Sequence, residues 1–278
     1  MKMQIESVIP PQAGRRFKAA LFDFDGTLSL IREGWQGVMI PYFCEELNAA
    51  PGYVSDREST AVVTEFVDRL TGKQTIFQCI ALADEISRRG GTPKDPAEYK
   101  SEYLRRLMQK IDWRRKGLAD GTIERDSLIV NGGARFVNAL RRAGLEIFCA
   151  SGTDQPQVRE EAALLGFDRF FGENIFGARD EDASACAKEA VIRRLIHERN
   201  IQPGELLSFG DGYVEIELVS SIGGYAVGVA TDEKHGGIDE GKRTRLLNAG
   251  AGAIIADFSD AEAILSYLGI KEGDNDDL

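Results

Sequence analysis

Short apolar runs recur along this chain, and most of them follow a segment whose apolar residues have helical spacing. An apolar run of this kind is typical of a strand that is buried on both faces of a parallel sheet. Strands that alternate with helices favour a three-layer α/β domain with a mostly parallel sheet. The predicted strands are residues 18–23, 144–151, 205–211, 225–230 and 253–257, and the predicted helices are 134–143, 183–199 and 243–249.

The pattern changes between Leu30 and about Ser127. Apolar residues here fall at helical spacing, as Val62, Phe66 and Leu70 do, and no run typical of a buried strand appears. We therefore predict a helical insertion that leaves the α/β core after the first strand and returns before the second. The predicted division is a core of residues 1–30 and 128–278 and an inserted helical domain of residues 31–127.

Composition limits the classes of partner. The chain has 278 residues and a net charge of −11, and its basic residues form only short clusters, so we expect no nucleic acid partner. No segment has the length and apolarity of a membrane span or a signal peptide, so we expect no membrane partner and a cytoplasmic location. The cysteines are far apart, which favours free thiols over a disulfide or zinc framework. They are Cys44, Cys79, Cys149 and Cys186.

Three of the predicted strands end in polar residues. These are Asp23, Ser151 and Asp211, which lie far apart in the sequence. Because ligands bind at the carboxyl ends of the strands in open parallel sheets, we expect these three side chains to converge at one edge. This convergence carries more weight than any single motif.

The first strand leads into the sequence Asp23-Phe-Asp25-Gly26-Thr27. One carboxylate can attack phosphorus to form an aspartyl-phosphate, and the second can transfer protons. The glycine permits a sharp turn and a close approach of the backbone to a ligand. The alternative is a strand followed by an Asx-type turn. A calcium loop is excluded, because that motif requires a further acid before the glycine and a glutamate beyond it.

Ser151 and Gly152 follow the second strand and precede a predicted helix start. Asp154 is the expected capping residue, Pro156 lies where the first turn would be, and Gly166 is placed to end the helix. A hydroxyl and free backbone N–H groups at a helix start favour phosphate binding. Plain helix capping is the alternative interpretation.

Two further positions suit a phosphate and metal site. Lys188 shares a helical face with Ile192 and Leu195, so it is expected to point inward as a cationic partner for phosphate or carboxylate. Asp211 and Glu215 face the same way if a helical turn begins there, and their hard oxygen atoms suit Mg²⁺. The alternatives are a solvated lysine and a glycine turn with a surface acid.

The residues described above form four motifs along the chain, namely Asp23-Phe-Asp25-Gly26-Thr27, Ser151, Lys188, and Gly210-Asp211 with Glu215. In this order, they resemble the motifs of the haloacid dehalogenase superfamily of hydrolases. The resemblance covers about residues 18–257 and implies a Rossmann-like core, with the helical insertion as the family's cap. It also implies a magnesium cofactor held by Asp23, by the backbone carbonyl of Asp25 and by Asp211. Glu215 is expected to support the metal directly or through water, although many members have aspartate there.

The resemblance implies further roles for these side chains. Asp23 is expected to be the nucleophile and Asp25 the general acid and base. Thr27, Ser151 and Gly152 are expected to bind the transferring phosphoryl group, and Lys188 to neutralise charge beside the nucleophile. Lys234 and Lys242 are alternatives for this lysine, although both follow the fourth motif.

The predicted activity is Mg²⁺-dependent hydrolysis of a small phosphorylated metabolite, such as a sugar or polyol phosphate. Asp25 favours phosphoryl transfer over dehalogenation, because an alkoxide leaving group needs a proton. A phosphosugar mutase of the same superfamily is the nearest alternative, and a non-catalytic binding module is a remote one. Arg32 and Trp35 begin the insertion and are predicted to select the substrate. Otherwise Trp35 belongs to the insertion's core and Arg32 is solvated.

Overall fold

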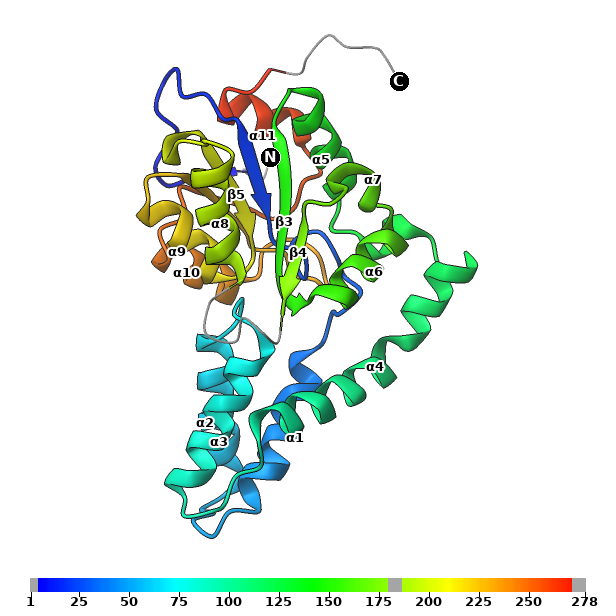
Figure 1. Cartoon of the computed structure of the whole chain (residues 1–278), viewed down its shortest axis with the longest axis vertical. Coiled ribbons are helices and arrows are strands. Elements are labelled where there is room, and N and C mark those ends of the chain that lie inside the picture. The colour runs from blue at the N-terminus through cyan, green and yellow to red at the C-terminus, as the bar shows by residue number, and fades with distance from the viewer. Residues whose placement is uncertain (1–4, 180–186, 272–278) are drawn as a thin grey trace.

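A single seven-stranded sheet forms the centre of the molecule (Figure 1). The computed structural model describes residues 5–179 and 187–271. The strand order is β1-β7-β6-β5-β2-β3-β4, and every pair is parallel except β1 with β7. The strands are β1 (Ile5–Ser7), β2 (Ala19–Phe22), β3 (Glu146–Asp154), β4 (Ile175–Ala178), β5 (Leu206–Gly210), β6 (Tyr225–Val229) and β7 (Ala253–Ile255).

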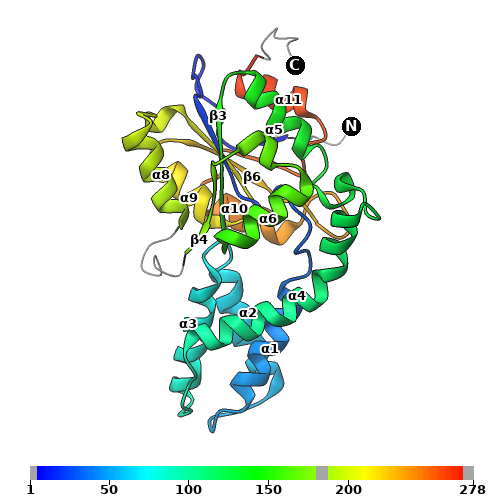
Figure 2. The same ribbon diagram turned by 45° about the vertical axis from the view of Figure 1, so that its right-hand side comes forward.

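Helices cover both faces of this sheet, which makes the three layers seen in Figure 2. Ala20 and Phe22 of β2 join one apolar cluster, and Ala19 and Leu21 join another, because alternate residues of a strand point to opposite faces. The first cluster includes residues of α5 (Gly133–Arg142), α6 (Gln155–Leu165), α7 (Asp168–Phe171) and α11 (Ala261–Leu268). The second includes residues of α8 (Ala187–Glu198), α9 (Tyr213–Ser221) and α10 (Glu240–Asn248).

The predicted three-layer α/β core is confirmed. All five predicted strands are present, with ends that differ by one to a few residues. The strand predicted to end at Ser151 continues to Asp154, and its pairing with β4 shifts register between Ala150 and Asp154. The sequence analysis missed β1 and β4, the two edge strands. The predicted start of the helix at residue 183 and Cys186 lie outside the described residues.

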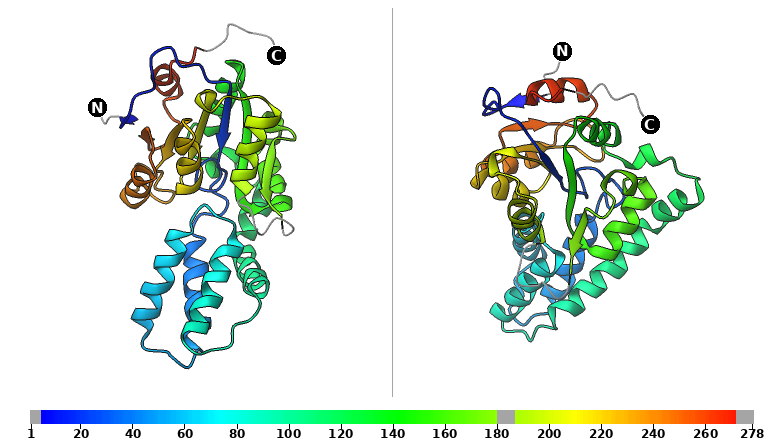
Figure 3. Two further views of the ribbon diagram at one scale, coloured as in Figure 1. Left: turned by 60° about the vertical axis from the view of Figure 1, so that its left-hand side comes forward. Right: turned by 45° about the horizontal axis from the view of Figure 1, so that its top comes forward.

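Four helices make up the insertion between β2 and β3. The helix α4 begins with a capping box at Asp95 and Glu98, and the left-handed Gly121 ends it. In the left view of Figure 3 the first three helices pack side by side beneath the core, and α4 returns to the core beside α6. The helices are α1 (Gln36–Asn48), α2 (Asp56–Arg69), α3 (Thr75–Arg88) and α4 (Pro96–Asp120), and a 3₁₀ turn (Arg125–Leu128) follows them.

The two connections that join insertion and core run beside each other. Leu30 N–H donates to Leu128 O, and Val130 N–H donates to Leu28 O, so the outgoing and returning chains are hydrogen-bonded. This arrangement places the insertion over the carboxyl end of β2. The exact domain boundaries at residues 31 and 127 stay a prediction. No helix in the described ranges is long and apolar enough to cross a membrane.

Candidate active site

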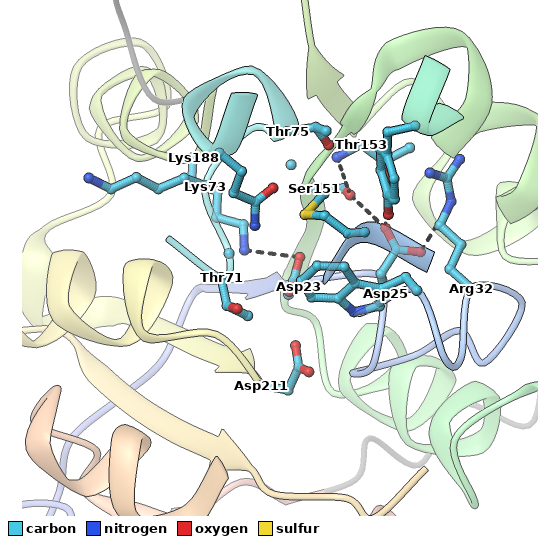
Figure 4. A pocket seen from close by; sticks show the side chains of 16 residues that line it. Asp23, Asp25, Arg32, Thr71, Lys73, Thr75, Ser151, Thr153, Lys188 and Asp211 are labelled. Atoms are coloured by element: carbon cyan, nitrogen blue, oxygen red, sulfur yellow. Dashed lines mark hydrogen bonds and ion pairs between the residues drawn. The ribbon is translucent and has the colours of Figure 1, made fainter. Parts of the chain in front are cut away.

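A cavity of about 90 Å³ lies between the carboxyl edge of the sheet and the helical insertion (Figure 4). Its core side is formed by residues that follow β2 and β5 and by residues near the carboxyl end of β3, together with Lys188 from α8. Its other side belongs to the insertion and its first connection. The core residues are Asp23, Asp25, Ser151, Gly152, Thr153, Lys188 and Asp211, and the others include Arg32, Trp35, Met39, Gln78 and Tyr103.

Asp23 follows β2 directly and is only 5% exposed. Its backbone N–H donates to Phe209 O of β5, which continues the parallel pairing by one residue and fixes the start of the loop. The ammonium of Lys188 lies 3.0 Å from Asp23 Oδ1 and 2.5 Å from Glu215 Oε2. The other Glu215 oxygen accepts the Gly212 N–H at 3.1 Å. Lys188 therefore joins the nucleophile candidate to a second buried carboxylate.

The charges around Asp23 are unbalanced. Burial raises the pKa of Asp23 well above its usual value, Lys188 opposes this rise, and the carboxylates of Glu215, Asp211 and Asp25 add to it. Burial opposes the charge of Lys188 too, but Asp23 and Glu215 raise the pKa of its ammonium, which therefore stays protonated. Lys188 is thus shared between Asp23 and Glu215, and a further cation beside Asp23 would complete the compensation.

Asp25 is held by two hydroxyl groups from β3. The Oγ atoms of Ser151 and Thr153 donate to Asp25 Oδ2 at 3.1 and 2.8 Å. Ser151 and Thr153 are two residues apart on a strand, so both point to the same side. Asp25 Oδ1 is buried and has no hydrogen-bond partner, and the nearest cation is Arg32 Nε at 3.7 Å. One oxygen of Asp25 is therefore fixed by hydroxyl groups, and the other is buried without a hydrogen bond.

Arg32 is buried rather than solvated, with 6% exposure. Its Nε and Nη2 atoms both donate to the Glu161 carboxylate at 2.9 Å, in a bidentate pair between the connection and α6. Burial raises the pKa of Glu161, and Arg32 opposes that rise. Arg32 lines the cavity as the sequence analysis expected, but Glu161 already accepts hydrogen bonds from two of its nitrogen atoms.

Asp211 follows β5 and is tied to Thr27. The Asp211 N–H donates to Thr27 Oγ1 at 3.0 Å, and Thr27 Oγ1 lies 3.4 Å from Asp211 Oδ1. Gly26 has a φ of +76°, and a Cβ atom there would overlap Asp211 Oδ2. The glycine of this turn therefore serves both its left-handed backbone and the close approach of the carboxylate.

A second lysine contacts Asp211. Lys242 Nζ, from the first turn of α10, lies 2.8 Å from Asp211 Oδ2 and 2.6 Å from Glu233 Oε1. Burial opposes the charge of Lys242, but both carboxylates raise the pKa of its ammonium. Burial raises the pKa of Glu233, against the effect of Lys242. Lys188 contacts Asp23, whereas Lys242 contacts Asp211, so these two candidates for the same role lie at different positions.

The insertion closes the cavity with a loop between α2 and α3. A Cβ atom on Gly152 would lie 2.6 Å from Lys73 O, and one on Gly212 would lie 3.1 Å from the Cα of Gly72. Because both positions are glycines, the loop between α2 and α3 can pack directly against the end of β3 and the residues after β5. Trp35 and Met39 give the cavity an apolar wall, and Gln78 and Tyr103 add neutral polar groups.

The donor set fits a magnesium ion. Among the described residues, no three His, Cys, Asp or Glu side chains are gathered as a ready-made metal cluster. Mg²⁺ does not need such a cluster, because it is usually bound by one or two carboxylates, water and substrate oxygens. Asp23 and Asp211 are both buried beside the cavity, and each shares its lysine with a second carboxylate. Their carboxylates and the Asp25 carbonyl are the oxygens that would hold the ion.

Comparison with protein families identifies the chain. The family model of haloacid dehalogenase-like hydrolases matches residues 17–223, which include β2, the insertion, β3 and β5. The chain belongs to the haloacid dehalogenase-like hydrolases. The match agrees with the superfamily that the sequence motifs indicated, and it means that this haloacid dehalogenase-like chain is an enzyme. A comparison with curated proteins gives no significant match.

Solved structures of haloacid dehalogenase-like proteins share the fold. A β-phosphoglucomutase from Clostridium difficile has a TM-score of 0.61 at 13% identity, over 91% of this chain and 97% of that one. A predicted phosphoglycolate phosphatase from Haemophilus somnus has a TM-score of 0.58 at 18% identity, over 89% of this chain and 97% of that one. A haloacid dehalogenase family hydrolase from Deinococcus radiodurans, with bound phosphate and sodium, has a TM-score of 0.54 at 17% identity, over 93% of this chain and 99% of that one. At these identities the similarity establishes the fold alone.

The structure of this haloacid dehalogenase-like hydrolase brings most predicted site residues to one cavity, but not all of them. Thr27 and Glu215 are absent from the described cavity lining: Thr27 binds Asp211, and Glu215 binds Lys188. Asp154 precedes α6 as predicted, but its carboxylate pairs with Lys100 instead of capping the helix.

Among the charged and hydroxyl groups around the acids, the sequence analysis missed Thr153, Glu161 and Glu233, and it named Lys242 only as an alternative for Lys188. Thr153 has a sequence signal, since it follows Ser151 by two residues and would share its side if the strand continued. Glu161, Glu233 and Lys242 lie in α6, a loop and α10, and only the tertiary fold brings them to Arg32 and Asp211.

Proposed function

We propose that this hydrolase is a Mg²⁺-dependent phosphomonoesterase that acts on a small phosphorylated metabolite through an aspartyl-phosphate. The observation that carries the proposal is the pair of Asp23 and Asp25 at the end of β2. Asp23 is buried beside Lys188, whereas Asp25 is held by Ser151 and Thr153. One carboxylate is thus placed next to a cation, and the other next to hydroxyl groups.

Asp23 is proposed to attack the phosphoryl group. Its Oδ1 atom is paired with Lys188, so the other oxygen is the one available for attack on phosphorus. The new O–P bond forms as the ester O–P bond breaks, and Asp25 gives its proton to the departing alkoxide. Lys188 and Mg²⁺ offset the negative charge of the phosphoryl oxygens, and Mg²⁺ also neutralises the acids that hold it.

The second step returns the enzyme to its starting state. Asp25, now ionised, takes a proton from a water molecule as that water attacks the phosphorus of the aspartyl-phosphate. The hydrogen bonds from Ser151 and Thr153 keep the Asp25 carboxylate in place for both steps. Free phosphate leaves, and Asp23 is again a carboxylate.

The insertion is proposed to recognise the rest of the substrate. Every phosphomonoester has the phosphoryl group in common, so selection depends on the wall opposite the acids. Trp35 offers a flat apolar face to the cavity, and Arg32 lines it beside Asp25. Selection by Arg32 and Trp35 stays a prediction, and the pairing of Arg32 with Glu161 makes Trp35 the stronger of the two.

A metal-dependence assay tests the proposed function. We expect release of free phosphate from phosphorylated polyols and sugars that stops with chelator and returns with Mg²⁺. Asp211→Asn should raise the Mg²⁺ concentration needed for half-maximal rate at least about tenfold, since a neutral amide replaces a charged ligand. Asp112→Asn, at an exposed position of α4, is the matched control and should leave that concentration unchanged. Undiminished turnover without divalent metal would rule out this mechanism, and isomerisation of a hexose phosphate without net phosphate release would indicate a mutase.

A leaving-group comparison tests the role of Asp25. We expect Asp25→Asn to slow hydrolysis of an alkyl phosphate about 10²–10⁴-fold, the usual contribution of general acid–base catalysis. The loss on an activated aryl phosphate should be smaller in the step that forms the aspartyl-phosphate, because that leaving group departs with little protonation. The burst of aryl alcohol in a rapid-mixing experiment measures this step. Asp112→Asn, an acid on the surface of α4, is the control. Equal losses of burst rate for both esters would contradict an acid role for Asp25.

A further inference from the structure

The lysine that contacts Asp211 has no part in the proposed chemistry. Lys242 lies between two carboxylates, Asp211 at 2.8 Å and Glu233 at 2.6 Å, and only 12% of its side chain is exposed. Asp211 is one of the two carboxylates proposed to hold Mg²⁺. An ammonium in contact with a metal-binding carboxylate repels the incoming cation, because like charges at short distance interact strongly in a partly buried site.

Asp211 is fixed on its other side. Its N–H and its Oδ1 atom both contact Thr27 Oγ1, and Gly26 allows Oδ2 to lie against the β2 loop. The carboxylate therefore has little freedom to turn away from Lys242. If one of the two groups moves when Mg²⁺ binds, the flexible lysine side chain is the one that is free to do so.

The surroundings give Lys242 a place to move. A second cavity of about 170 Å³ adjoins the pair of Lys242 and Glu233, and its lining also includes Asp239 and Trp35. Glu233 Oε1 already accepts a hydrogen bond from Lys242 Nζ, so the ammonium keeps a partner if it leaves Asp211. The shift needs rotation of one side chain and no movement of the backbone.

We propose that Lys242 is an internal competitor of Mg²⁺ for Asp211, and that Glu233 accepts its ammonium when the metal binds. This proposal rests on the proposed function, in which Asp211 is a metal ligand. Lys242 compensates the charge of Asp211 in the metal-free protein and lowers the affinity for Mg²⁺. Glu233 has the opposite effect, since it makes the displacement of Lys242 from Asp211 less costly.

Direct Mg²⁺ binding to the purified protein without substrate tests the proposal, by calorimetric titration. We expect Lys242→Met to bind Mg²⁺ about tenfold more tightly than the wild type, because one competing unit charge is removed. Glu233→Gln should bind about tenfold more weakly, because Asp211 is then the one carboxylate of the described residues that forms an ion pair with Lys242. Lys234→Met is the control, because it removes the same charge from an exposed position in the loop that carries Glu233. Its Mg²⁺ affinity should stay within about threefold of the wild type.

The outcomes separate this proposal from the function it rests on. If the wild type binds no Mg²⁺, the metal requirement of the proposed function fails. If it binds Mg²⁺ but Lys242→Met matches Lys234→Met or binds more weakly, only the competition fails. Should Lys242→Met not fold, Glu233→Gln decides alone, and unchanged or tighter Mg²⁺ binding by that variant overturns the proposal.

Discussion

Asp23→Asn is expected to lower turnover at least about a hundredfold, equivalent to ~3 kcal/mol or more of lost transition-state stabilisation. The amide of asparagine is a poor nucleophile and a poorer ligand for Mg²⁺, so both proposed roles of the side chain are lost. The fold should be retained, because the side chains are nearly the same size. The substitution also removes one of the buried acids beside Lys188. Burial and the neighbouring carboxylates raise the pKa of Asp23, so its charge is not needed for the fold.

Trapping of the phosphorylated enzyme provides a second measurement for the same variant. The wild type, quenched in acid during turnover of a labelled phosphate ester, should retain label on protein, and Asp23→Asn should not. The matched control is Asp257→Asn, which changes an acid after β7 that accepts the Ser259 N–H. If the asparagine variant keeps more than about a hundredth of wild-type activity, or retains label, Asp23 is not the nucleophile.

The sequence predicted the core well because its signals are local. Each central strand is an apolar run that is buried on both faces, and such runs are visible without a partner. β1 and β4 were missed because they are short edge strands, and edge strands have less need of a continuous apolar sequence. Ile5–Ser7 has only partly buried and exposed residues, and Ile175–Ala178 includes a glycine.

The site could be predicted only where residues follow a strand. Asp23, Ser151 and Asp211 were expected to meet because the carboxyl ends of parallel strands share one edge, and all three line the cavity. Glu161, Glu233 and Lys242 could not be predicted in this way. Their positions depend on how α6, the loop after β6 and α10 pack on the sheet. Such packing brings Arg32 to Glu161 across 129 positions of sequence.

The same limit explains the two residues whose contacts differ from their expected roles. Thr27 and Glu215 lie within four residues of Asp23 or Asp211, so the sequence places them near the site but not in a particular orientation. In the structure Thr27 holds Asp211, and Glu215 holds Lys188. We therefore infer that Thr27 acts on the site through Asp211, and that Glu215 acts through Lys188.

Lys188→Met is expected to have the largest effect on stability. The side chain of Lys188 is 1% exposed and contacts Asp23 and Glu215, which are themselves almost fully buried. Removing one partner of a buried ionic group costs about 3–5 kcal/mol, because it leaves uncompensated charge in the interior. Urea unfolding of the metal-free protein measures this loss. Lys116→Met, in which an exposed lysine of α4 is replaced, should lie within about 0.5 kcal/mol of the wild type.

A double variant separates the structural effect of Lys188 from its effect on catalysis. Lys188→Met with Glu215→Gln removes one buried positive and one buried negative charge together, so much of the lost stability should return. Turnover should stay at least about a hundredfold below the wild type, because no ammonium then faces Asp23 and the phosphoryl group. Glu215→Gln alone keeps Lys188 on Asp23 and should retain far more activity than the double variant. Recovery of activity in parallel with stability would mean that Lys188 only balances buried charge and has no role beside the nucleophile.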